Sequence, residues 1–224
     1  MILLSDRRIS AIALGDTGEP MIDLREVPEL RIDSRLADPA GAYAHLREGV
    51  AQRLLDAQRA LPDGLRLLVI EAYRPLRLQT EYFEGYKDEL RAAHPGWDAE
   101  RLHTEASKYV SPPDVAPHST GGTVDLTLCT EQGLELDMGT AVNASPLASA
   151  DACFTASPHV SAVAREHRDV LSLALSGVGM VNYPTEWWHW SFGDRYWALQ
   201  TRAVQTRYGP VASVGAEQAG RVRG

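Results

Sequence analysis

Two stretches of the chain repeat apolar residues at three- and four-residue steps, which is the spacing of one face of an α-helix. The first extends from Tyr43 to Leu61 and stops at Pro62-Asp63-Gly64, because Pro and Gly turn the chain. The second covers residues 160–176 and stops at Gly177-Val178-Gly179. Three further helices are expected, over residues 76–93, 99–109 and 196–203.

Shorter patterns predict the strands. The apolar run Leu67-Leu68-Val69-Ile70 indicates a buried strand over residues 65–73. It ends at Arg74-Pro75, because Pro holds the residue before it in an extended conformation. Residues 123–128 alternate and are rich in β-branched side chains, and residues 188–192 predict a closing strand.

These strands and helices follow one another without a regular β-α-β rhythm, which predicts an α+β fold in a single domain, residues 1–208. Residues 209–224 are small and polar, so a frayed tail is expected there. With 224 residues, of which 44% are hydrophobic, the chain can bury a core without disulfides. Cys129 and Cys153 are therefore expected to be reduced and buried.

Charge and hydropathy narrow the possible partners. The formal net charge of −8 disfavours nucleic acid, because counterion release from nucleic acid needs clustered Lys and Arg. Only Ile2-Leu3-Leu4 precedes the first charged residues, which is too short for a signal peptide, and no run suits a membrane span. We therefore expect a cytoplasmic protein without a membrane partner, and the oligomeric state stays open.

Two short segments carry the candidate chemistry: residues 117–125, with His118 and Asp125, and residues 186–189, with Glu186 and His189. Two imidazoles and one carboxylate suit Zn²⁺ and leave its fourth tetrahedral position open, as in a catalytic zinc site. Glu186 is then free to take the proton of a water at the metal.

Both segments need a break in the backbone. His118 and Asp125 are seven residues apart, and Glu186 and His189 are three residues apart. On a straight strand, side chains at an odd spacing face opposite sides. Gly121-Gly122 lets His118 lie on a turn while Asp125 lies on the strand, and a bend near Pro184-Thr185 is expected to bring Glu186 and His189 to one cleft.

Four segments, in order, resemble the zinc D-Ala-D-Ala dipeptidases and D,D-carboxypeptidases, and the likeness is nearest to the dipeptidase branch. Residues 118–125 resemble the family's S-x-H-x-x-G-x-A-x-D segment, and residues 186–189 resemble its E-x-W-H segment. Residues 71–75 resemble its G-Y-R-P, and residues 136–140 resemble its M-G-[ST] turn. The resemblance covers about residues 65–200.

This resemblance implies a small, mostly antiparallel central sheet flanked by helices, with one zinc ion per chain in a cleft on the sheet, as in hedgehog domains and D,D-peptidases. It implies His118, Asp125 and His189 as zinc ligands, Glu186 as general base and then acid, and Arg74 as the group that stabilises the oxyanion. The implied substrate is a small D,D-dipeptide. The residues expected to contact it are Tyr73, Ser119, Asn143, Asp151 and Trp188.

The chain departs from the family where the amino end of a dipeptide would bind. Pro117 replaces a Ser and Asn143 replaces an Asp, which removes the carboxylate partner of a buried ammonium group. Asp151 is a candidate replacement. Two alternatives therefore stay open: a D,D-carboxypeptidase acting on longer or N-acylated peptidoglycan peptides, and a non-catalytic zinc-binding module. Glu186 and Arg74 speak against the module, because a purely structural zinc needs neither.

Overall fold

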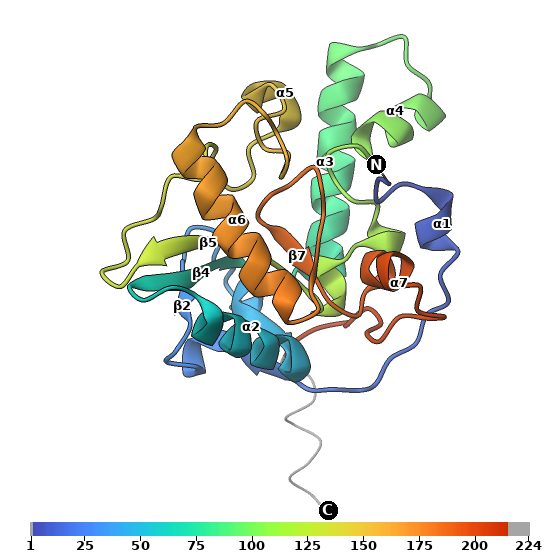
Figure 1. Cartoon of the computed structure of the whole chain (residues 1–224). Coiled ribbons are helices and arrows are strands. Elements are labelled where there is room, and N and C mark those ends of the chain that lie inside the picture. Colours follow the sequence, from blue (N-terminus) through green and yellow to red (C-terminus); the bar gives the residue numbers. More distant parts are fainter. Residues whose placement is uncertain (1, 215–224) are drawn as a thin grey trace, which may run out of the picture.

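A five-stranded sheet forms the centre of the computed structural model, which describes residues 2–214 (Figure 1). Its order is β2 (Arg31–Ile32), β4 (Leu65–Glu71), β5 (Thr123–Thr130), β7 (His189–Ser191) and β6 (Val181–Asn182). Only β2 and β4 are parallel; all other neighbours are antiparallel. The predicted α+β class and mostly antiparallel sheet are confirmed.

The long helices flank this sheet. α2 (Glu48–Ala60) and α6 (Ala162–Gly177) pack against each other and against the strands, and α3 (Leu76–Ala93) and α4 (Ala99–Ala106) form a hairpin that extends away from it (Figure 1). Shorter elements complete the described chain: α1 (Arg7–Ser10), α5 (Pro146–Ser149), α7 (Arg195–Thr201), and the 3₁₀ turns η1 (Leu24–Glu26), η2 (Ala42–Ala44), η3 (Pro113–Val115) and η4 (His118–Thr120).

The expected helix from Tyr43 begins five residues later, at Glu48. Residues 45–47 instead form β3 (His45–Arg47), which pairs with β1 (Met21–Asp23) in a second, two-stranded sheet. The carbonyls of Tyr43 and His45 also accept hydrogen bonds from Ala72 and Tyr73 at the exit of β4. Backbone pairing to two distant segments outweighs the helical spacing of the side chains, because a helical periodicity does not exclude other backbone partners.

Other expected boundaries agree more closely. α3 covers residues 76–93 as predicted, whereas α4 ends at Ala106 rather than at residue 109. Cys129 and Cys153 are free and buried, as expected. No helix among residues 2–214 is long and apolar enough to cross a membrane.

The start of the expected frayed tail contacts the domain. The Gly209 carbonyl accepts a hydrogen bond from the Arg47 guanidinium, at 3.2 Å. The Val211 N–H donates to the Ser119 carbonyl at 2.8 Å, and the Val211 carbonyl accepts from the Tyr73 hydroxyl at 2.8 Å. Residues 215–224 lie outside the described part of the chain, so the prediction for them stays a prediction.

Candidate active site

Strand register brings three acidic and basic side chains into one row across the sheet. Asp125 on β5 is paired with His189 on β7 and, on its other side, with Glu71 at the end of β4. The β4–β5 register shifts between Val69 and Glu71, so β4 has one extra residue there. Because side chains alternate along a strand, this bulge sets which β4 residue lies opposite Asp125.

His118 reaches the same place from the turn before β5. It lies on η4, and Gly121 ends that turn in the left-handed conformation, with φ of 68°. Gly122 lies so close to the Phe192 carbonyl that a Cβ there would be 2.5 Å from its oxygen. Gly121-Gly122 therefore separates the turn that carries His118 from the strand that carries Asp125, as the sequence analysis predicted.

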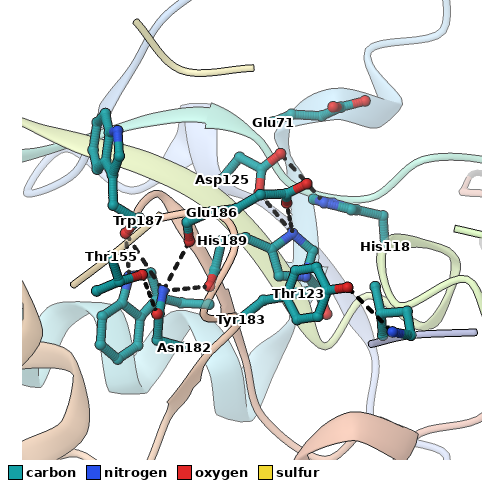
Figure 2. Close-up of polar contacts among 12 residues, drawn as sticks. Glu71, His118, Thr123, Asp125, Thr155, Asn182, Tyr183, Glu186, Trp187 and His189 are labelled. Carbon is teal, nitrogen blue, oxygen red and sulfur yellow. Dashed lines mark hydrogen bonds and ion pairs between the residues drawn. The ribbon is translucent and has the colours of Figure 1, made fainter. Parts of the chain in front are cut away.

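The nitrogen and oxygen atoms of His118, Asp125 and His189 converge (Figure 2). All three residues are buried, and one ligand atom from each lies within 4.8 Å of the others. His118 Nδ1 donates to the Ala72 carbonyl at 2.7 Å, which leaves Nε2 with its lone pair 3.4 Å from Asp125 Oδ2. His189 Nδ1 lies 3.0 Å from Asp125 Oδ1.

This donor set fits a divalent cation. Within the described residues, buried Asp125 Oδ1 accepts no hydrogen bond of proper geometry, although His189 Nδ1 lies 3.0 Å from it. A buried acceptor is costly to leave unpaired. In neutral histidines the two facing nitrogens are also acceptors, so the three side chains direct lone pairs at one point. Burial acts to raise the pKa of Asp125, but the charge and hydrogen bonds of protonated His118 and His189 hold it far below its usual range. A cation bound to neutral histidines would act in the same direction, so the carboxylate is ionised in either case.

Glu186 lies beside this cluster without belonging to it. Its Oε2 is 3.4 Å from His189 Nδ1, and its backbone forms a turn in which the Glu186 N–H donates to Tyr183 and the His189 N–H donates to Glu186. The Asn182 side chain holds this turn by donating to the carbonyls of Glu186 and His189, at 3.0 Å each (Figure 2). The bend expected near Pro184-Thr185 is therefore present.

The protonation of Glu186 is set by burial and by neighbouring charge. Burial raises the pKa of Glu186 to about 7, while the positive charge of His189 acts in the opposite direction. A cation held by the adjacent residues would act in the same direction as the charge of His189 and lower the pKa of Glu186, because opposite charge favours the ionised form. The carboxylate is thus suited to accept a proton near neutral pH.

Arg74 is held rigidly at the edge of the same site. Its Nε donates to Glu71 Oε1 at 2.7 Å, and a second hydrogen bond joins Nη2 to Glu71 Oε2. Its Nη1 donates to Gln79 Oε1 at 2.7 Å. Glu71 holds the pKa of Arg74 above its usual range despite burial, so the guanidinium stays charged. Glu71 and Gln79 were not singled out from the sequence; the Glu71-x-x-Arg74 spacing at a strand end was the available signal for Glu71.

A cleft of about 990 Å³ opens over these residues. Arg74, His118, Asp125, Glu186 and His189 all line it. Its far wall comes from the α3–α4 hairpin, and its other side comes from the loop after residue 142. The lining residues from these segments include Tyr82, Gly85, Tyr86, Glu89, Glu105, Lys108, Tyr109, Asn143, Ser145 and Pro146.

The expected substrate residues fall into two groups. Asn143 and Trp188 line the cleft, and the buried indole N–H of Trp188 has no hydrogen-bond partner among residues 2–214. Tyr73, Ser119 and Asp151 are not among the described residues that line it. The Ser119 hydroxyl donates to the Arg74 carbonyl, and Asp151 is exposed on a loop. Their placement gives the expected substrate contacts no support.

A buried, ionised ligand cluster beside a free carboxylate in an open cleft is the layout of a metal-dependent hydrolase.

A D-alanyl-D-alanine dipeptidase of Synechocystis sp. is 30% identical to this chain over 219 residues, or 85% of this chain and 88% of that protein. One from Escherichia coli is 30% identical over 188 residues, or 79% and 86%. The crystal structure of a vancomycin-resistance D,D-pentapeptidase in complex with Zn(II) aligns with a TM-score of 0.43 and 18% identity, over 78% of this chain and 89% of that one.

The family model described as D-Ala-D-Ala dipeptidase matches residues 31–208. The chain therefore belongs to the D-Ala-D-Ala dipeptidase family and is a hydrolase, as the sequence analysis predicted.

Proposed function

We propose that this protein is a zinc-dependent D,D-dipeptidase that hydrolyses D-Ala-D-Ala or a closely related dipeptide. The observation that carries the proposal is the convergence of His118, Asp125 and His189 in one cleft, with Glu186 and Arg74 beside them. Membership of the family supports the same reaction. The cytoplasmic location stays a prediction.

The three convergent side chains would hold one zinc ion, which supplies a Lewis acid that makes a water more acidic and polarises the scissile carbonyl. Glu186 accepts the proton of the attacking water and then donates it to the leaving amine, so no proton is gained or lost. Arg74 has three of its five N–H groups occupied by Glu71 and Gln79, which leaves two for the developing oxyanion.

The non-catalytic alternative has less support. A zinc site that only stabilises the fold does not require a further carboxylate beside the metal ligands. It also does not require a charged guanidinium that faces the cleft. Here Gln79 accepts a hydrogen bond from the Arg74 guanidinium, and Asn182 donates to the Glu186 backbone carbonyl, while the Glu186 carboxylate lies 3.4 Å from His189 Nδ1. An ordered guanidinium and a carboxylate beside the ligand cluster in one cleft favour a catalytic role.

The size of the cleft favours the second candidate, a D,D-carboxypeptidase acting on longer peptides. A volume of about 990 Å³ suits a drug-sized ligand and exceeds what two alanines occupy. From Tyr82 to Leu90 the cleft follows α3 over ~12 Å, given the helical rise per residue. Residues on the amino side of the scissile dipeptide can therefore be accommodated along the helix.

Comparing three substrates separates these candidates. The zinc-loaded protein is assayed on D-Ala-D-Ala, on N-acetyl-D-Ala-D-Ala and on a tetrapeptide ending in D-Ala-D-Ala, by release of D-Ala. A dipeptidase is expected to prefer the free dipeptide in kcat/KM. Preference for the blocked or longer substrates identifies the carboxypeptidase, and no hydrolysis of any of the three by zinc-loaded protein rejects both.

Glu186→Gln tests the catalytic carboxylate directly. The amide keeps the shape of the side chain but cannot accept the proton of water, so kcat is expected to fall by at least ~10²-fold. Zinc content, measured by atomic absorption, and melting temperature should match the wild type. Near-normal turnover in a variant with confirmed sequence excludes this role for Glu186.

A further inference from the structure

We infer that Gln79 is a positioning residue that fixes the guanidinium of Arg74 toward the scissile carbonyl. The inference rests on the proposed function, because it concerns the group that stabilises the oxyanion in that reaction. It is carried by the buried hydrogen bonds that join Arg74, Gln79 and the backbone of Ser111.

Gln79 lies in the first turns of α3 and is only 1% exposed. Its Oε1 accepts from Arg74 Nη1 at 2.7 Å, and its Nε2 donates to the Ser111 carbonyl at 2.7 Å. Both the donor and the acceptor ends of this buried amide are therefore used. The neighbours fix its orientation, because a guanidinium can only donate and a carbonyl can only accept.

Gln79 restrains a motion that Glu71 alone would leave possible. The carboxylate of Glu71 holds one edge of the guanidinium through Nε and Nη2. Nη1 lies on the other side, where Gln79 supplies its hydrogen bond. The guanidinium carbon of Arg74 lies over the ring of Tyr82, 5.1 Å from the ring centroid, so the ring covers one face of the guanidinium. Contacts from three directions keep the two free N–H groups in one orientation.

Gln79 also links this group to the segment that leads to the candidate ligand His118. This segment covers residues 111–118, and Gln79 binds the carbonyl of its first residue, Ser111. At its last residue, the His118 carbonyl accepts a hydrogen bond from the Arg74 N–H at 3.3 Å. A loss of Gln79 is therefore expected to affect turnover through orientation. The candidate ligand His118 and the charge of Arg74 are expected to be unaffected, because the Ala72 carbonyl holds the His118 ring and Glu71 stays paired with Arg74.

The test is a double-mutant cycle with Gln79→Met and Arg74→Ala, assayed on the best of the three substrates with zinc-loaded protein. Met keeps a similar length and helix propensity but supplies neither hydrogen bond. Gln79→Met is expected to lower kcat by ~10-fold, the scale of one hydrogen bond to a charged group, with KM changed less than about 2-fold. In the Arg74→Ala background it should change kcat by less than about 2-fold, because there is nothing left to orient.

Gln58→Met is the matched control. Gln58 is also a buried helical glutamine with two backbone partners, the Leu65 carbonyl and the Leu67 N–H, but it binds the end of β4 opposite Glu71. Its substitution should lower the melting temperature and leave kcat per folded molecule unchanged. If Gln79→Met does not fold, Gln79→Glu keeps the acceptor for Arg74 and should retain kcat within about 3-fold.

The outcomes distinguish two failures. If Arg74→Ala keeps full activity, the oxyanion role of Arg74 in the proposed function is wrong. If Arg74→Ala loses activity while Gln79→Met keeps wild-type kcat, only the positioning role is overturned. A Gln79→Met effect of equal size in both backgrounds also overturns it, because the effect then does not act through Arg74. Loss of kcat in Gln79→Glu equal to that in Arg74→Ala has the same consequence.

Discussion

At the scale of single residues, the cleft carries a neutral amide where the family resemblance implies a carboxylate. Asn143 lines it, where the family resemblance implies an Asp, and the candidate replacement Asp151 does not line it. A buried ammonium without an ionised partner is unfavourable, so under the proposed function we expect the amino end of a free dipeptide to be held weakly here. The identity of residue 143 should therefore affect the choice between free and N-acylated substrates.

Asn143→Asp is expected to lower KM for D-Ala-D-Ala by ~10-fold relative to N-acetyl-D-Ala-D-Ala, the scale of one charge-assisted hydrogen bond. Asn143 has φ of 64°, a conformation that Asn and Asp tolerate similarly, so the substitution adds charge without backbone strain. Asp151→Asn is the control, because Asp151 has φ of 62° on the same loop but lies outside the cleft lining. Steady-state kinetics on both substrates measure the ratio. An unchanged ratio in Asn143→Asp, or a changed one in Asp151→Asn, contradicts this account.

At the scale of elements, the turn from His118 to Asp125 depends on how closely two backbones approach. Gly122 accepts a hydrogen bond from the Phe192 N–H at 2.8 Å, and the Phe192 carbonyl lies where a side chain on Gly122 would begin. The turn and the strand must keep this spacing for His118 and Asp125 to converge.

Gly122→Ala is expected to destabilise the fold by ~1–3 kcal/mol and to weaken zinc binding, because the new Cβ would be 2.5 Å from a backbone oxygen that cannot rotate away. Thermal unfolding and zinc titration measure the two effects. Gly96→Ala is the control, since nothing lies within 4 Å of a Cβ at that position. Equal stability of the two variants argues against a tight approach at Gly122.

At the scale of the whole molecule, the metal site joins parts that are distant in sequence. The candidate ligands come from η4, β5 and β7, and the partners of Glu186 and Arg74 come from β6, β4 and α3. Asp125 Oδ1 is buried among these parts and, within residues 2–214, accepts no hydrogen bond of proper geometry, so a cation would supply its missing partner. A metal that binds only the folded state should therefore stabilise the complete domain.

The protein is first freed of metal with a chelator. Zinc added at about a thousandfold excess over its Kd is then expected to raise the free energy of unfolding by ~4 kcal/mol. For a chain of this size that corresponds to a rise in melting temperature of roughly 10 °C, measured by scanning calorimetry. The rise should disappear in His118→Ala. It should persist in His167→Ala, where another histidine donates Nδ1 to a backbone carbonyl but lies away from the cluster. A rise that survives in His118→Ala contradicts the ligand assignment.

The sequence by itself determined the local features. Helical spacing and the glycines at its end were sufficient for α6, whose apolar face and end are encoded within a few residues. The types of the candidate ligands and the need for a break at Gly121-Gly122 also follow from local spacing, because alternation along a strand is a property of the backbone.

Tertiary structure decided what depends on distant partners. β3 replaced the predicted first turns of a helix because β1 and the exit of β4 supply its hydrogen bonds. Glu71 lies in the row of Asp125 because of a bulge in β4, and Gln79 meets Arg74 because α3 begins beside the strand exit. Asp151 lies outside the cleft although it follows Asn143 closely in sequence. Such contacts are set by strand register and loop path, which no local pattern records.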